Sequence, residues 1–259
     1  MKKVLTIAGS DCSGGAGIQA DLKTISAFGI YGMSVITALT AQNTLGVNGV
    51  RTTDKEFTRL QIRSVFEDIF PDAIKIGMVS DAGNIQVIKE ELENFNAENI
   101  VLDTVMVSTS GHSLIDENAK DVLIKTLIPI ADIITPNIAE AEVLSRITVN
   151  EREDMVRAAK IISDITDAAI LIKGGHLKDC ADDMLYSAGK IEWFNEEHVD
   201  NKNTHGTGCT LSSAIACGLA EGFTIEKSVL NAKNYLTGAI KNGLNIGKGR
   251  GPLNHMYRI

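Results

Sequence analysis

The sequence predicts an α/β fold of three layers, in which helices cover both faces of a mostly parallel central β-sheet. Two observations predict it. Short apolar, β-rich runs alternate with amphipathic helical runs along nearly the whole chain of 259 residues. In addition, 44% of the residues are hydrophobic, which is enough for a large core. No linker, low-complexity tract or repeat interrupts the alternation, so we expect residues 1–259 to form one domain.

Each expected strand is a short run rich in β-branched and other apolar residues. The expected strands are residues 3–8, 34–39, 73–76, 100–102, 132–134 and 168–172. Each expected helix carries apolar residues at roughly helical spacing. The expected helices are 17–28 with Ile18, Leu22 and Ile25, one with Phe57, Leu60, Val65 and Ile69 that ends before Pro71, one with Met155, Ala158, Ala159 and Ile162, then 208–221 and 224–242.

Two segments depart from this alternation. Within residues 184–194, two short strands flank Ser187-Ala188-Gly189, which predicts a short antiparallel hairpin at one edge of the sheet. Residues 42–53 are polar, contain glycine and follow a strand. We expect this second segment to extend from the sheet as a small flap.

Composition excludes several classes of protein. A formal net charge of −8, from 25 Lys and Arg against 33 Asp and Glu, argues against binding to nucleic acid or an anionic membrane. The apolar run at residues 4–9 is too short for a signal peptide, and residues 127–134 are too short to span a membrane. Four cysteines lack metal-ligand spacing and are expected to be reduced thiols: Cys12, Cys180, Cys209 and Cys217. A cytoplasmic protein is expected.

Ligands of such sheets bind beyond the carboxyl ends of the strands, so the segments that follow strands are the candidate site. The first is the glycine-rich turn at residues 8–17, which contains Asp11. Glycines permit close approach to a ligand, and a helix start offers amide donors. The turn is neither GxGxxG nor a Walker A loop. A ligand site is favoured over a tight connection whose glycines serve geometry alone.

A second candidate segment leads from Asn203 into an apolar helix. Gly206, Thr207 and Gly208 can present successive amide donors at the helix start, where the helix dipole favours negative charge. Such an anion hole suits a transferring phosphoryl group. Cys209 would lie in the first turn, where thiol pKa values tend to fall. A capped helix with an inert cysteine remains the alternative.

Two carboxylates and a lysine complete the candidate site. Asp103 follows one strand, and Glu140 lies on a helix after Thr135-Pro136, with Thr135 as the expected N-cap. Carboxylates near a phosphate suit Mg²⁺, although Glu140 alone would be read as a solvated residue. Lys173, which precedes Gly174-Gly175, can reach a nucleotide phosphate or can lie in a plain turn. Together these groups predict a phosphotransferase without a Walker A loop.

The motifs resemble those of a known family along the whole chain. The sequence is similar to the ribokinase-like superfamily and, within it, to the hydroxymethylpyrimidine/phosphomethylpyrimidine kinases of thiamine biosynthesis. The matching segments are residues 6–11, 13–23, 38–44, 75–78, 103–107, 135–137 with 140–141, 173–176, 203–212 and 247–255.

This resemblance implies an ATP-dependent kinase that phosphorylates the hydroxymethyl group of an aminopyrimidine and then the resulting monophosphate. It implies that the pyrimidine pocket is lined by Gly9, Ala16, Asp21, Gln42, Met78 and Val107. It also implies that ATP phosphates are held by Lys173, Thr204, Gly206 and Gly208, and that Asp103 and Glu140 act near Mg²⁺. Cys209 takes the place of the general base, beside the anion hole of Gly206, Thr207 and Gly208. A homodimer is expected.

Two alternatives stay open beside this interpretation. A pyridoxal kinase shares the scaffold and the Gly206–Cys209 type of motif, but generally differs around Gln42, at 110–111 and at 249–255. A pyrimidine sensor without catalysis would not need Lys173 or Cys209. One position departs from the family: Thr109 stands where lysine is common, which affects a phosphate contact expected from that loop.

Overall fold

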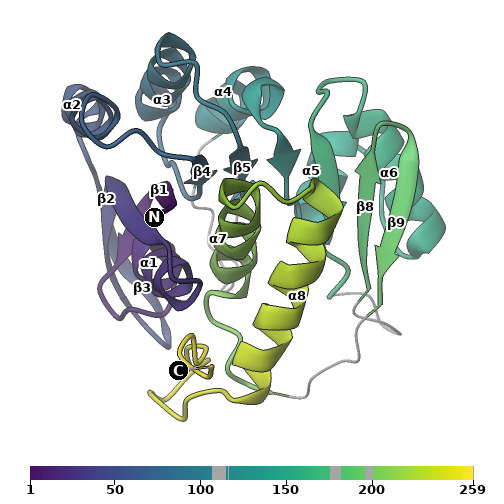
Figure 1. The fold of residues 1–259 in the computed structure, drawn as a ribbon. Helices are drawn as coiled ribbons and strands as arrows, with labels where there is room; N and C mark the ends of the chain where they lie inside the picture. Colours follow the sequence, from purple (N-terminus) through teal and green to yellow (C-terminus); the bar gives the residue numbers. More distant parts are fainter. Residues whose placement is uncertain (107–114, 116, 176–181, 196–200, 259) are drawn as a thin grey trace.

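The structure is a computed structural model that describes residues 1–106, 115, 117–175, 182–195 and 201–258 (Figure 1). Within these residues, one nine-stranded sheet has the order β3-β2-β1-β4-β5-β6-β7-β8-β9. Its strands are β1 Lys3–Asp11, β2 Tyr31–Asn43, β3 Gly46–Thr52, β4 Ala73–Ile76, β5 Ile100–Leu102, β6 Ile133–Ile134, β7 Ala169–Ile172, β8 Asp183–Ser187 and β9 Lys190–Phe194. All six strands expected from the sequence are present; β1 and β2 are longer than expected, and β6 and β7 are each one residue shorter.

The helices fall into two layers (Figure 1). They are α1 Gly17–Ala27, α2 Lys55–Phe66, α3 Ala82–Asn94, α4 Glu117–Thr126, α5 Ile138–Ser145, α6 Arg152–Ile162, α7 Thr207–Ala220 and α8 Ile225–Lys241, with a short 3₁₀ turn η1 at Ile128–Ile130. Helices α2 to α6 pack in one hydrophobic cluster on one face of the sheet, and α1, α7 and α8 pack in another on the opposite face. The predicted three-layer α/β/α fold is confirmed.

The direction of the strands also agrees with the sequence. Strands β2, β1, β4, β5, β6 and β7 are mutually parallel. Strands β8 and β9 form the antiparallel edge, and their turn, Ala188-Gly189, has positive φ at both residues, as a type I′ hairpin requires. The flap is likewise a hairpin, because β3 pairs antiparallel with the end of β2. Strand β1 has β2 on one side and β4 on the other, which makes its carboxyl end a topological switch point.

One expected apolar face is wrong. The sequence placed Phe57 and Leu60 on the buried side of α2, but each is 58% exposed. The Asp54 side chain caps the helix start, and the buried stripe is Thr58, Ile62 and Phe66. These residues follow an i, i+4, i+8 spacing, so the helix is rotated away from the expected face.

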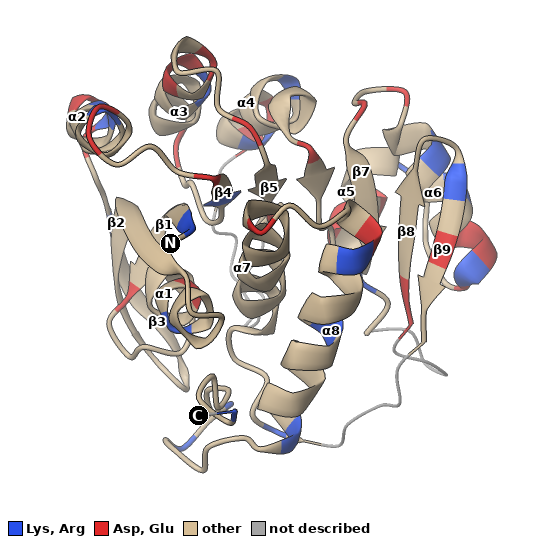
Figure 2. Ribbon diagram, in the orientation of Figure 1, with Lys and Arg blue, Asp and Glu red and all other residues tan. Residues whose placement is uncertain are grey.

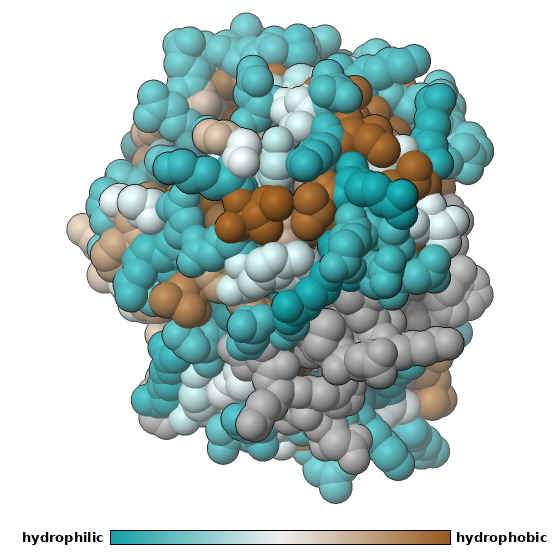
Figure 3. Space-filling view, turned by 90° about the vertical axis from the view of Figure 1, so that its right-hand side faces the viewer, coloured by the Kyte–Doolittle hydropathy of each residue, from teal (hydrophilic) through white to brown (hydrophobic). Residues whose placement is uncertain are grey.

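Charge distinguishes α7 from the outer helices. Figure 2 shows charged residues along α2, α3 and α6, whereas Thr207–Ala220 contains no Lys, Arg, Asp or Glu. A helix that is apolar all round belongs in a core, and α7 packs between α1 and α8. Figure 3 shows the side of the molecule that carries α6, β8 and β9, where small hydrophobic groups lie among hydrophilic residues. Val143 of α5 and Ile161 of α6 are among the partly exposed apolar residues of the outer helices. No helix among the described residues is long and apolar enough to cross a membrane.

Candidate active site

The candidate residues meet where the parallel strands end and α7 begins. A Cβ added to Gly208 would lie 3.3 Å from Asp103 Oδ2 and 3.6 Å from Lys173 Nζ. The start of α7 therefore rests directly on the groups that follow β5 and β7. On the other side of this helix start, His205 contacts Asp11 at the end of β1. Residues from four separate segments thus form one site.

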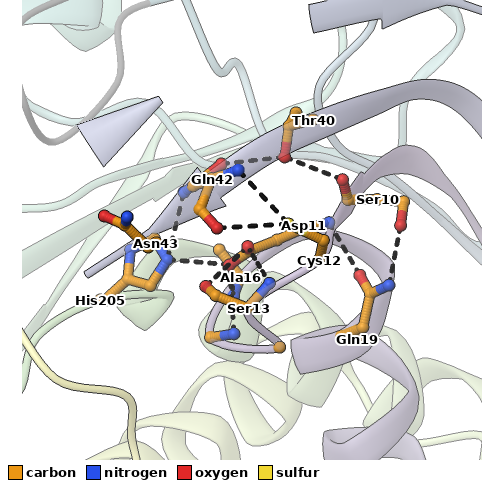
Figure 4. Close-up of polar contacts among 12 residues, drawn as sticks. Ser10, Asp11, Cys12, Ser13, Ala16, Gln19, Thr40, Gln42, Asn43 and His205 are labelled. Atoms are coloured by element: carbon orange, nitrogen blue, oxygen red, sulfur yellow. Dashed lines mark hydrogen bonds and ion pairs between the residues drawn. The ribbon is translucent and has the colours of Figure 1, made fainter. Parts of the chain in front are cut away.

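Asp11 organises the glycine-rich turn (Figure 4). Its carboxylate accepts hydrogen bonds from the backbone amides of Ser13, Gly15 and Ala16 and from the Ser13 hydroxyl, at 2.8 to 3.1 Å. Burial would raise the pKa of Asp11, but His205 and the Ser13 donors outweigh it and hold the pKa at about 2. The amides of Gly15 and Ala16 point at Asp11, which corrects the expectation that this turn offers them to a ligand.

Glycines let the turn and the anion-hole segment touch through their backbones. A Cβ on Gly206 would overlap the carbonyl oxygen of Gly15, and a Cβ on Gly15 would overlap the His205 ring. Gly206 also has a φ of +85°, in the region that favours glycine. Only residues without side chains allow this approach, so these glycines serve the contact between the two loops.

The flap closes the same side of the site. Gln42 lies near the end of β2, and its backbone exchanges two contacts with the Cys12 thiol, at 3.2 and 3.3 Å. The side-chain Oε1 of Gln42 lies 3.2 Å from Thr40 Oγ1, and its Nε2 lies 3.2 Å from His205 Nε2. At the flap tip, Thr44 Oγ1 accepts hydrogen bonds from the amides of Lys248 and Gly249.

The residues expected to line a pyrimidine pocket do not all share one surface. Gly9 and Met78 are in contact, because a Cβ on Gly9 would lie 2.5 Å from Met78 Cε. Ala16 follows in the adjacent turn, and Val107 lies outside the described residues. Asp21 has no exposed surface, because its carboxylate is enclosed by other groups. The expectation that it contacts a ligand is therefore corrected.

Asp21 instead belongs to a sealed ion pair. Lys75 Nζ lies 2.8 Å from Asp21 Oδ2, and both side chains are 0% exposed. The hydroxyls of Thr6 and Ser213 donate to the same carboxylate. Burial would lower the pKa of Lys75, but the Asp21 charge outweighs it and raises that pKa. The pair therefore has a structural role in the core beside the site.

Asp103 and Lys173 form a second pair that remains open. Lys173 Nζ lies 3.0 Å from Asp103 Oδ1, and the lysine side chain is 17% exposed. Thr135 and Ser212 also donate to the Asp103 carboxylate. Burial would raise the pKa of Asp103, but the Lys173 and Lys75 charges lower it. Burial would lower the pKa of Lys173, but Asp103 and Glu140 raise it. Both groups keep their charges at neutral pH.

Glu140 has a structural role that the sequence did not reveal. Asn137, rather than the expected Thr135, is the N-cap of α5, and Asn137 and Glu140 form a capping box. The Glu140 carboxylate also accepts from the Thr104 hydroxyl and, at 3.3 Å, from the Met106 amide. Burial raises the pKa of Glu140. Pro136 thus lies before the helix rather than in its first turn. The Thr135 hydroxyl donates to Asp103 instead of capping the helix.

Cys209 is a less reactive thiol than its position predicts. The sequence led us to expect a pKa lowered by the helix start, but burial raises the pKa of Cys209 to about 11. Lys75 and the backbone amide of Gly17 oppose that rise without reversing it. The expectation of a readily formed thiolate is therefore wrong for the protein without ligands.

Sequence reasoning missed His205, Lys75 and Ser212. A lysine inside the apolar run at 73–76 was a usable signal for Lys75, because an unpaired charge is too costly to bury there. His205 stands beside the glycines of the anion hole and could have been considered with them. Ser212 carries no such signal, since only the fold brings it to Asp103.

Comparisons with known proteins find two related kinds of kinase. A family model described as phosphomethylpyrimidine kinase matches residues 11–254. A hydroxymethylpyrimidine/phosphomethylpyrimidine kinase of Streptomyces coelicolor is 45% identical over 256 residues, covering 99% of this chain and 95% of that protein. A crystal structure of phosphomethylpyrimidine kinase from Clostridium difficile is 49% identical with a TM-score of 0.85, covering 93% of this chain and 100% of that one. Pyridoxal kinase of Staphylococcus aureus in complex with AMP-PCP is 36% identical with a TM-score of 0.92, covering 100% and 94%.

Proposed function

The chain belongs to the phosphomethylpyrimidine kinase family, and from this premise we propose that it transfers a phosphoryl group from ATP to the hydroxymethyl group of an aminopyrimidine. It then phosphorylates the monophosphate, which yields the pyrophosphate used to build thiamine. The observation that carries this proposal is the position of Gly208, where an added Cβ would lie 3.3 Å from Asp103 Oδ2 and 3.6 Å from Lys173 Nζ. Phosphoryl transfer needs groups that position the phosphates and stabilise their charge. A helix start, a lysine and a carboxylate that lie together can supply both.

Each group has a proposed task. The amides of Gly208 and Cys209 have no partner within α7 because they belong to its first turn, and with Thr204, Gly206, Thr207 and Lys173 they hold the phosphates of ATP. Gln42, with Gly9, Ala16, Met78 and Val107, holds the pyrimidine ring. These assignments come from the family motif and from the way the segments meet.

The donor set fits Mg²⁺. Asp103 is ionised because its pKa is lowered, and Mg²⁺ is usually bound through one or two carboxylates together with substrate phosphates and water. Asp103 would hold the ion. Glu140 would act near it, since its oxygens already accept hydrogen bonds within the fold. When bound, Mg²⁺ would neutralise charge on the phosphates, which Lys173 would orient.

Cys209 is the proposed proton acceptor toward the substrate hydroxyl. Its pKa of about 11 leaves a small thiolate fraction at neutral pH, and Lys75 and the Gly17 amide are the groups that stabilise that fraction. We expect Cys209→Ala to lower kcat by about 10² to 10⁴-fold with ATP binding retained. Cys217→Ala, on the same helix but fully buried, is the matched control. An unchanged kcat for Cys209→Ala would remove this residue from the mechanism.

Pyridoxal phosphorylation is the second candidate, because solved pyridoxal kinases match the whole fold with TM-scores up to 0.92. The test of both is ADP release with Mg-ATP and, in turn, hydroxymethylpyrimidine, its monophosphate and pyridoxal. Turnover of both pyrimidines, with pyridoxal much slower, supports the proposal. Preference for pyridoxal overturns it. Turnover of the first pyrimidine alone would implicate Thr109, which stands where lysine is common in the family.

Assembly and location complete the proposal. Leu39, Val50, Phe57 and Leu60 are large apolar residues of β2, β3 and α2, each at least 44% exposed, and a second copy of this chain is the proposed cover for them. Sedimentation of the purified protein tests this homodimer. We propose that the reaction takes place in the cytoplasm.

A further inference from the structure

A polar network links three segments that are far apart in the chain (Figure 4). One ring nitrogen of His205, Nε2, lies 3.0 Å from Asp11 Oδ2 and 3.2 Å from Gln42 Nε2. The His205 side chain is 12% exposed. A single nitrogen thus contacts both the carboxylate of the glycine-rich turn and the amide of the flap.

The His205 ring is held in place. Its edge packs against Gly15 so closely that a Cβ there would overlap the ring. The His205 backbone amide donates to the Gly251 carbonyl at 3.2 Å, and His205 forms a β-bridge with Pro252. The ring therefore presents the same nitrogen to Asp11 and Gln42.

The proton on that nitrogen is determined by Asp11. The Asp11 carboxylate is ionised at neutral pH, since its pKa is about 2, and an ionised carboxylate only accepts hydrogen bonds. His205 Nε2 must therefore carry a proton and donate it to Asp11. A protonated Nε2 has no lone pair left, so it cannot accept from an amide NH₂ group of Gln42.

The contact between Thr40 and the other end of the Gln42 amide also indicates that the NH₂ group faces away from His205. Thr40 Oγ1 lies 3.0 Å from the Ser10 carbonyl oxygen and 3.2 Å from Gln42 Oε1. A hydroxyl has one proton, and the Ser10 carbonyl can only accept it. Thr40 then offers Gln42 only lone pairs, which suit an NH₂ group. A half-turn of the Gln42 amide suits both contacts. Its oxygen then faces the His205 Nε2–H, which it shares with Asp11 as a bifurcated hydrogen bond, and its NH₂ group faces the Thr40 oxygen.

We propose that His205 is a positioning residue that holds the Gln42 amide with its carbonyl toward His205 and its NH₂ toward Thr40. The proposal rests on the proposed function and adds how the pyrimidine is selected. In this rotation, one N–H and one carbonyl lone pair of Gln42 stay free for a ligand. The free carbonyl lone pair can accept from an amino group of the ligand, and the free N–H can donate to a neighbouring ring nitrogen. His205 sets the rotation of the amide and so determines which position in the site offers the donor and which offers the acceptor.

The tautomer of His205 tests the inference without any activity measurement. A long-range ¹H–¹⁵N correlation spectrum of the unliganded, ¹⁵N-labelled wild-type protein at neutral pH distinguishes the two neutral forms. The His205 signals are assigned by their absence from the spectrum of His205→Phe. We expect a proton on Nε2. A neutral ring protonated on Nδ1 alone would overturn the inference.

Kinetics test whether this proton selects the substrate. His205→Phe keeps an aromatic ring on Gly15 but removes the donor. We expect kcat/KM for hydroxymethylpyrimidine to fall about tenfold to a hundredfold, mainly through KM, with KM for ATP unchanged. The preference for the pyrimidine over pyridoxal should shrink with it. Thermal unfolding of His205→Phe verifies that the variant is folded.

Thr44→Val provides the matched control, because it removes hydrogen bonds at the flap tip without touching the Gln42 amide. A loosened flap should affect pyrimidine and pyridoxal alike. Equal losses on both substrates in His205→Phe would overturn the selection role. If the unaltered chain turned over no pyrimidine, the proposed function would fail, and the tautomer would still decide whether His205 donates to Asp11.

Discussion

Two buried lysine–aspartate pairs lie near the same edge of the sheet and differ in their surroundings. Lys75 and Asp21 are both 0% exposed, and their remaining partners are hydroxyl groups of the core. Lys173 is 17% exposed and lies next to the start of α7. The enclosed pair cannot reach a ligand, whereas the open pair can exchange one partner for a phosphate. Accessibility, rather than the chemistry of the pair, separates a structural role from a functional one.

The largest expected effect comes from breaking the enclosed pair. Lys75→Met leaves the Asp21 carboxylate buried without its countercharge, which should cost about 3–5 kcal/mol of unfolding free energy. Urea denaturation measures this loss. Replacing both partners, in Lys75→Met with Asp21→Asn, should recover much of it. A single variant as stable as the wild type would mean that the pair does not hold the core.

Breaking the open pair should instead reduce catalysis. Lys173→Met removes a donor to the transferring phosphoryl group, so we expect kcat to fall about 10² to 10³-fold. Steady-state ADP release measures it. Lys233→Met is the matched control, because Lys233 pairs with Asp183 at 2.8 Å and is similarly buried. If both variants lost kcat equally, Lys173 would have no special role.

The pH dependence of Cys209 sharpens the comparison, since the charge of Lys75 partly opposes the rise in the pKa of this thiol. With the pKa raised to about 11, the thiolate fraction grows tenfold per pH unit until that value is reached. At pH 8 we expect Cys209 to react with iodoacetamide about a hundredfold more slowly than an accessible thiol of ordinary pKa. Peptide mass spectrometry measures the rate, with exposed Cys12 labelled in the same sample. A rate independent of pH between 8 and 10 would contradict the raised pKa.

The smallest effect is expected for a pair at the surface. Lys2 Nζ lies 3.4 Å from Asp72 Oδ1, with side chains 44% and 26% exposed. Lys2→Ala should change the unfolding free energy by less than about 1 kcal/mol, because water and salt screen the two charges. Urea denaturation at low and high salt tests this. A loss as large as that of Lys75→Met would refute the importance of burial in the comparison.

Most of the fold could be predicted because each layer leaves a local signature. Apolar runs such as 73–76 and 100–102 agree with β4 and β5 in both bounds. The start of α5 could not be placed from spacing alone. Thr135 and Asn137 are both good N-caps, and only the fold shows that the Thr135 hydroxyl is already engaged with Asp103.

The site was harder to predict because its contacts are long-range. Asp103, Lys173 and Gly208 were all selected from the sequence, and the fold brings them together. Asp21 was placed on the ligand surface because its motif is typical of the family, but its partner Lys75 lies 54 residues away. The pKa of Cys209 depends on burial, which a helix start in a sequence does not reveal.

The close approach of Gly15 to Gly206 has a consequence for how variation at this site is read. In a library containing every substitution, both positions would be depleted as strongly as residues that touch substrate, because any side chain would push the two loops apart. Tolerance to substitution would therefore report how closely the two loops pack as well as chemistry. At Gly15, where an added Cβ would meet the His205 ring, a lack of accepted replacements need not mean contact with a ligand.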